Sequence, residues 1–408
     1  MKQLATPDLP EEKRSLDGGR SWFLTPAAWV GLILLGGGGA LAYSTEDGLQ
    51  RFLQSYLFAY SFFLTLALGA LFFILISHLT RAGWSVTLRR LSEDLAICLW
   101  LAALLFVPIV LGLGHLYEWA RPEIVANDPL LQRKAVYLNT TFFTVRWIFY
   151  FAVWIGLAHF FYRVSGRQDE TGDPALTLRM ERVSAPGTLL FSLTITFASF
   201  DLLMSLDAHW FSTIFGVYFF AGSVASFFAL LALLVIVIQR FGILEQSVTV
   251  EHLHDLGKLT FGFIVFWAYI AFSQYMLIWY ANLPEETGWY ERRQEGEWMW
   301  ASLALLVGHF FVPFLFLMSK HVKRRKGLLA AGACWVLLMH AFDLYWIIMP
   351  QKHFGEPGRI PFHVFDVVCI VGFALLFFAA GRDAMRRRCL IPQRDPRLAE
   401  ALAFENES

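Results

Sequence analysis

The chain has 408 residues, of which 57% are hydrophobic and only 16% are charged, and its formal net charge is zero. Soluble proteins carry about 25% charged residues, and nucleic-acid-binding proteins present a basic surface, so the composition argues against both classes. The apolar residues occur in long blocks, which is typical of a multi-pass membrane protein. We therefore predict an all-α fold of membrane-spanning helices.

Ten apolar blocks are each long enough to cross about 30 Å of hydrocarbon as a helix. The first block is longer than a signal-peptide core of about 7–15 residues, so we interpret it as a retained span. We expect two helix bundles between a polar segment, 1–21, and a polar tail, 382–408. The predicted transmembrane domain, 22–381, contains the spans 22–43, 54–79, 95–116, 141–162, 187–206, 211–239, 257–281, 298–319, 327–349 and 361–381.

The orientation follows from the distribution of basic residues. Segments on the N-terminal side of the predicted membrane contain 23 Lys and Arg residues, whereas the segments on the opposite side contain 8. Because short cytoplasmic loops are enriched in basic residues, we predict that both termini are cytoplasmic.

The fifth predicted span contains a carboxylate, Asp201, and a charge in a membrane helix is costly and often functional. Asp201 lies about 21 Å from the inner end of its span, on a small and polar face. We predict a role in proton movement, and the alternative is a structural ion pair with Arg146 on the fourth span. Asp207 and His209 follow at the outer end, and together with Arg146 they join the candidate set for the proton path.

Two His-x-x-Asp pairs occur at similar depth in the ninth and tenth spans, His340 with Asp343 and His363 with Asp366. Consecutive antiparallel helices are usually neighbours, so the two pairs are expected to form one cluster. An imidazole beside a carboxylate is suited to handling protons near neutral pH. The alternative is that these are hydrogen-bonded residues at the ends of the spans.

Three further polar residues lie near the middle of the predicted membrane. His309 in the eighth span is the most central imidazole, and Tyr269 and Ser273 share a face of the seventh span. We predict that these three residues form the middle of a proton path. The alternative for His309 is a hydrogen bond to a neighbouring helix.

Cofactor motifs are not evident in the sequence. The four cysteines, Cys98, Cys334, Cys369 and Cys389, have no CxxC spacing, which argues against a covalent haem, an iron–sulfur cluster or a zinc site on this chain. A Walker loop or a dinucleotide fingerprint is also not recognised. We therefore assign no catalytic residue and no metal site, and the sequence does not indicate which residues would contact a quinone.

Three stretches carry a resemblance to a known family: Ser199–Ser223 (SFDLLMSLDAHWFSTIFGVYFFAGS), Phe266–Thr287 (FWAYIAFSQYMLIWYANLPEET) and His340–Pro350 (HAFDLYWIIMP). With the ten-span layout, they make the chain resemble the NrfD-like membrane subunits of the polysulfide reductase superfamily. The resemblance is greatest to ActF, the smaller NrfD-like subunit of bacterial alternative complex III, and extends over essentially the whole chain.

This resemblance implies a location in the bacterial cytoplasmic membrane and a set of partners. These are multihaem and monohaem cytochrome c subunits, a periplasmic iron–sulfur subunit, a larger NrfD-like paralogue and small membrane subunits, besides lipid. Menaquinol or another quinol would be oxidised by the complex, and haem c and iron–sulfur clusters on the partners would carry the electrons. In the family, the smaller subunit is associated with a proton path and the larger paralogue with the quinol site.

We therefore predict a membrane subunit of a quinol:cytochrome c-type oxidoreductase that contributes a proton path and an assembly surface. One alternative is a stand-alone secondary transporter, for which broken helices in corresponding places of two repeats would be expected. Pro108 and Pro313 interrupt two spans, but we identify no corresponding interruptions in the two halves. Another alternative is a purely structural scaffold.

Overall fold

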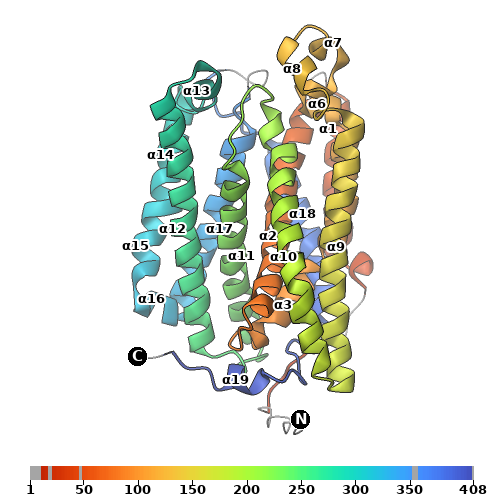
Figure 1. Ribbon diagram of the computed structural model, residues 1–408, viewed down its shortest axis with the longest axis vertical. Coiled ribbons are helices and arrows are strands. Elements are labelled where there is room, and N and C mark those ends of the chain that lie inside the picture. The colour runs from red at the N-terminus through yellow and green to blue at the C-terminus, as the bar shows by residue number, and fades with distance from the viewer. Residues whose placement is uncertain (1–10, 17–20, 46–47, 352–356, 407–408) are drawn as a thin grey trace.

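The computed structural model describes residues 11–16, 21–45, 48–351 and 357–406, so parts of the predicted terminal segments lie outside the described residues. Within those ranges, ten helices are long and apolar enough to cross a membrane, and they run side by side along one long axis (Figure 1). This confirms the prediction of an all-α multi-pass membrane protein. Strands are absent from the same ranges, apart from one isolated bridge between Lys13 and Ile243.

The helices in chain order are η1 (Trp22–Leu24), α1 (Pro26–Tyr43), α2 (Gly48–Leu79), α3 (Val86–Ala96), α4 (Leu99–Leu105), α5 (Val107–Leu111), α6 (Leu113–Leu116), η2 (Glu118–Ala120), α7 (Pro122–Val125), α8 (Pro129–Lys134), α9 (Thr140–Thr171), α10 (Ala175–Leu202), η3 (Met204–Leu206), α11 (Phe215–Gln239), α12 (Val250–Ala281), α13 (Pro284–Glu291), α14 (Glu297–Leu305), η4 (Leu306–Phe311), α15 (Val312–Met318), α16 (Lys320–Arg324), α17 (Lys326–Ile348), α18 (Val364–Met385) and α19 (Leu398–Leu402).

Both described ends of the chain lie at the same end of the bundle, which we call the inner end; the opposite end is the outer end. The backbone N–H of Leu244 donates to the carbonyl of Lys13, and the Asn406 side chain donates to the carbonyl of Glu251. These contacts bring the two ends of the chain to the turn between α11 and α12 (Figure 1).

Several helices extend past the predicted spans at the inner end. α9 continues to Thr171 and α10 begins at Ala175, whereas the corresponding predicted span limits are residues 162 and 187. Hydropathy marks only the part of a helix that lies in hydrocarbon, and a helix can continue into water with a polar sequence. Gly172 ends α9 with φ of 68°, a left-handed conformation that glycine adopts readily.

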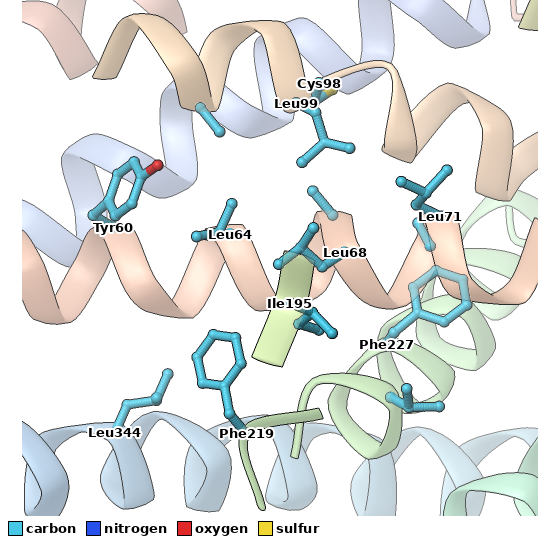
Figure 2. Packing of buried hydrophobic residues seen from close by; sticks show 14 of the residues in the cluster. Tyr60, Leu64, Leu68, Leu71, Cys98, Leu99, Ile195, Phe219, Phe227 and Leu344 are labelled. Carbon is cyan, nitrogen blue, oxygen red and sulfur yellow. The ribbon is translucent and has the colours of Figure 1, made fainter. Parts of the chain in front are cut away.

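The core is organised around α2 and α11, whose apolar windows are each 78% buried. Figure 2 shows Leu64, Leu68 and Leu71 of α2 within this packing, with Phe219 and Phe227 of α11 close by. One continuous hydrophobic core includes residues from all ten long helices. The expected division into two bundles is therefore not seen as a division of the core in the described residues.

Spans three and eight are both interrupted in the structure. The third span is divided into α3, α4 and α5, with Pro108 in the first turn of α5. The eighth is divided by the π-helical turn η4, with Pro313 directly after it. Proline has no N–H, so Pro313 cannot donate the usual helical hydrogen bond to the carbonyl of His309.

The C-terminal segment folds back across the inner end of the bundle. Arg388 donates to Asp94 at 2.8 Å and lies 2.9 Å from Glu93. Further along, Asp395 pairs with the buried Arg89, and Arg397 pairs with Glu181 at 2.7 Å. The predicted polar tail is therefore anchored by ion pairs over its described part.

The close packing of α2 on α11 generates a stability prediction. A Cβ atom added at Gly69 would lie 2.6 Å from the carbonyl oxygen of Ser223 and against the side chain of Phe227. We expect Gly69→Ala to destabilise the protein by about 1–3 kcal/mol, since overpacking forces the helices apart. Gly262→Ala is the control, because no atom lies within 4 Å of that position. Thermal unfolding in detergent measures both, and equal stabilities would contradict the predicted close approach.

Candidate functional site

A polar cluster lies among the apolar side chains at the middle of the bundle. It consists of one or two side chains from each of five long or interrupted helices, and we call it the central cluster. All six members are buried, with at most 5% of each residue exposed. The central cluster is Thr65 of α2, Tyr218 of α11, Trp267 of α12, His309 of η4, and His340 and Asp343 of α17.

Asp343 accepts hydrogen bonds from two aromatic donors. The hydroxyl of Tyr218 donates to one carboxylate oxygen, and the indole N–H of Trp267 donates to the other at 3.2 Å. In the part of the chain that the structure describes, no Lys, Arg or His nitrogen lies within ion-pair distance of Asp343. Two donors stabilise its ionised form, while burial without a cation favours its neutral form, so Asp343 is chemically suited to exchanging a proton.

His340 lies one helical turn before Asp343 and contacts α2. Its Nε2 is 2.9 Å from Oγ1 of Thr65, and that hydroxyl also donates to the carbonyl of Phe62 at 2.6 Å. Because the single hydroxyl proton is used in this way, we assign the imidazole proton to Nε2. Nδ1 is then an acceptor, and it has no protein partner among the described residues. A Cβ atom at Gly222 would lie 3.2 Å from this nitrogen, so the glycine allows the His340 ring to pack closely against α11.

His309 is the most isolated member of the central cluster. The side chain is fully buried, and neither ring nitrogen has a hydrogen-bond partner among the described residues. Its ring stacks on Trp267 with 3.9 Å between centroids, and the His340 ring is 6.4 Å away. Since buried polar groups are nearly always hydrogen-bonded, these nitrogens are positioned for water or a bound molecule. The π-helical turn that carries His309 is a feature often found at functional sites.

Asp201 occupies a different site, between α9 and α10. The guanidinium of Arg146 forms a bidentate pair with it, with both donor–acceptor distances at 2.8 Å, and Tyr150 donates at 3.0 Å. The rings of Tyr137 and Phe142 flank the same guanidinium at 3.8 and 4.3 Å. This is the structural pair with Arg146 considered as the alternative, and it joins two neighbouring helices.

The two His-x-x-Asp pairs are used in different ways. Asp366 pairs with Arg51 of α2 at 2.5 Å and accepts from Ser55 at 2.7 Å. His363 is exposed and caps the N-terminus of α18, where its backbone N–H donates to Asp366. The described contacts of His363 and Asp366 do not include His340 or Asp343, so the structure does not bring the two pairs into direct contact.

Asp207 and His209 lie in the outer loop that follows η3. Asp207 pairs with Arg292, and His209 contacts Asp128 at 2.6 Å. Burial alone would raise the pKa of Asp128, but the backbone N–H of Leu131 and the imidazole of His209 hold that pKa below its ordinary value. These contacts fix the loop to other outer segments.

A small hollow of about 30 Å³ opens at the outer end, beside this loop. Asp207, Arg292 and Trp289 line it. Trp289 stacks on Trp210 at 4.3 Å, and the ring of Phe215 lies between Trp210 and Tyr218. Aromatic side chains therefore separate the outer hollow from the central cluster.

The seventh span presents a different face to the interior from the one predicted. Tyr269 is 65% exposed and faces away from the bundle, and Ser273 is half-buried. The buried residues of α12 at this depth include Trp267, Ile270 and Gln274. The structure therefore does not bring Tyr269 to the central cluster, although His309, His340 and Asp343 do come together.

Sequence reasoning missed Tyr218, Trp267 and Thr65. All three are residue types that fill apolar cores, and nothing in their own helices marks them as polar partners. One available signal was spacing, because Tyr218 and Gly222 lie one turn apart on the face of α11 that receives α17.

The fold and the site together define a multi-pass α-helical membrane protein. Its buried central cluster contains imidazole nitrogens that have no hydrogen-bond partner in the described chain. The comparisons with known proteins do not refine this class. Neither a protein-family model nor a curated protein matches the sequence.

The pair between Asp201 and Arg146 leads to a prediction. Asp201→Asn leaves the buried Arg146 without its counter-ion, so we expect a loss of about 3–5 kcal/mol in stability. The double variant Asp201→Asn/Arg146→Gln removes both charges and is expected to recover part of this loss. Thermal unfolding of both variants measures the effect. A stable Asp201→Asn protein with reduced proton conduction would instead assign Asp201 to a proton path.

Proposed function

We propose that this chain is the membrane subunit of a quinol-oxidising electron-transfer complex in the bacterial cytoplasmic membrane, where it provides a transmembrane proton path and an assembly surface. The central cluster would form the middle of the path. Haem c and iron–sulfur clusters on partner subunits would carry the electrons, and menaquinol or another quinol would supply them. The partner subunits are those implied by the resemblance to NrfD-like and ActF proteins.

The observation that carries the proposal is that neither ring nitrogen of the buried His309 has a hydrogen-bond partner in the described chain. Two imidazoles and a carboxylate are grouped deep inside the bundle, and three of the four imidazole nitrogens lack a protein partner in the described chain, while the fourth contacts a single hydroxyl. A purely structural cluster would be expected to satisfy these atoms, as the pairs at Asp201 and Asp366 do. Unsatisfied imidazoles in a membrane interior instead favour a proton relay through water.

The side chains support a specific role for each residue. Asp343 accepts and releases a proton, while Tyr218 and Trp267 hold its carboxylate in place. His340, with its free Nδ1, can take a proton that arrives from the side of His309. The stacked rings of Trp267 and His309 keep the two imidazoles close. The 6.4 Å between their ring centroids is too long for a direct hydrogen bond between ring nitrogens. Proton transfer between the two imidazoles therefore requires at least one bridging water.

A proton can pass between the central cluster and the outer end only if the aromatic side chains between them move or if a single file of water passes them. The aromatic wall formed by Trp289, Trp210 and Phe215 lies between the central cluster and the outer hollow. Beside it, Ser212 donates to Gln274 and Gln274 donates to Tyr290, both at 2.9 Å. This short hydrogen-bonded chain is the most direct polar route past the wall.

A secondary transporter remains the second candidate because of the interruptions in spans three and eight. Each is the third member of a set of five spans, and each contains a proline at its interruption. Broken helices at corresponding places are typical of transporters built from repeats. Such a protein would move protons or another ion only together with a solute.

The proton path is tested by Asp343→Asn in proteoliposomes. The protein is purified with the subunits that accompany it, and proton uptake is driven by a potassium diffusion potential and followed with a pH-sensitive dye. We expect Asp343→Asn to lower the flux by about 100-fold, the scale on which a lost proton carrier acts. Tyr218→Phe is expected to give a smaller loss, since the carboxylate remains.

His363→Gln is the matched control, because His363 is exposed and serves as a helix cap. Its flux should equal that of the wild type. Equal fluxes for Asp343→Asn and wild type would overturn the proton path. A flux that appears only when a solute is added would favour the transporter.

A further inference from the structure

Four arginines project from the inner end of the hairpin formed by α9 and α10: Arg163, Arg167, Arg179 and Arg182. The two helices are antiparallel neighbours and extend together at the inner end (Figure 1). All four residues are exposed. In the described residues none of their nitrogens has an acidic side chain within 4 Å, and Arg179 lies over the ring of Phe160 at 5.4 Å.

This lack of acidic partners distinguishes the four arginines from the arginines of other segments that contact the hairpin. Most other arginines at the inner end that contact α3, α9 or α10 are paired with carboxylates. Three acidic residues of the hairpin are engaged elsewhere. Asp169 pairs with Arg90, Glu181 pairs with Arg81 and Arg397, and Asp173 accepts from the backbone N–H of Ala175. The fourth, Glu170, is exposed and forms no ion pair with the four arginines in the described chain. The four guanidinium groups are therefore accessible to an anionic partner.

The arginines continue the outward-facing apolar stripes of their helices. On both helices, exposed or half-buried residues recur every three or four positions, which places them on one face. On α9 the exposed stripe is Val145, Phe149, Ala152 and Gly156, and it continues past the half-buried His159 and Phe160 to Arg163 and Arg167. On α10 it is Phe197, Leu193, Leu189 and Pro186, followed by Arg182 and Arg179.

Depth along the helices places the four charges at one membrane boundary. Arg163 lies about 32 Å from Phe142 along α9, and Arg182 lies about 30 Å from Leu202 along α10, at 1.5 Å per residue. The hydrocarbon layer is about 30 Å thick. An outward-facing, largely apolar stripe of this length meets the lipid headgroups at Arg163 and Arg182. Arg167 and Arg179 lie about one turn beyond them, farther from the hydrocarbon on the inner side.

We propose that the α9–α10 hairpin binds the phosphate of anionic phospholipid headgroups. Guanidinium groups bind phosphate oxygens in a bidentate manner, and the surface potential of an anionic leaflet adds about 1 kcal/mol per basic residue. Two arginines on each helix form a concentrated positive edge directly against the lipid. The inference does not depend on the proposed proton path.

The test is a lipid titration of the full chain in detergent, followed by native mass spectrometry. Phosphatidylglycerol is expected to bind more tightly than phosphatidylcholine. Each arginine contributes about fivefold to affinity, so Arg163→Gln/Arg182→Gln should weaken phosphatidylglycerol binding by about 25-fold. Arg163→Lys/Arg182→Lys keeps the charge and should recover most of the binding. Thermal unfolding confirms that the variants are folded.

Arg240→Gln/Arg325→Gln is the matched control, since both arginines are exposed at the inner end outside the hairpin. Its affinity for phosphatidylglycerol should equal that of the wild type. Equal binding of the two lipids, or an equal loss in the control, would overturn the proposal. Full displacement of the lipid by inorganic phosphate would assign the hairpin to soluble phosphate and would also overturn it.

Discussion

Hydrocarbon offers an ionisable side chain no water, so each buried charge in this bundle must find a counter-ion or exist in a neutral form. Asp201 and Asp366 find one, in Arg146 and Arg51, and their pairs join α9 to α10 and α2 to α18. Asp343 does not, since its described partners are the uncharged donors Tyr218 and Trp267. This difference separates the ion pairs that hold the helices together from Asp343, a buried carboxylate without a cationic partner in the described chain.

Small residues and one irregular turn make this arrangement sterically possible. Gly222 leaves room for the His340 ring, and Gly308 lies against Met339. Pro313 deprives the carbonyl of His309 of its usual helical donor, and the resulting π-helical turn is where His309 enters the bundle. The proline and the central imidazole therefore belong to the same irregular part of the span. Packing and chemistry are coupled at this position.

The sequence was sufficient to predict the helical class and the number of spans, because hydropathy reports directly on length in hydrocarbon. It also identified His309, His340 and Asp343 as candidates, since ionisable residues are conspicuous in apolar blocks. It named Arg146 as a partner for Asp201 but not Arg51 as the partner of Asp366, because that pair joins helices that are distant in the chain. It also misjudged α12, where Tyr269 faces outward and Trp267 faces inward. Polar and aromatic residues occur on two faces of that helix, and the packing of the neighbouring helices determines which face is buried.

The central claim is that this chain works as the proton-conducting part of a redox complex, and its most direct test is native extraction of the tagged chain. Mass spectrometry would identify the accompanying subunits, and a reduced-minus-oxidised spectrum would detect haem. The account predicts co-purification with c-type cytochromes and an iron–sulfur protein, together with a c-type haem spectrum. A chain that purifies alone, without haem absorbance, would contradict the account.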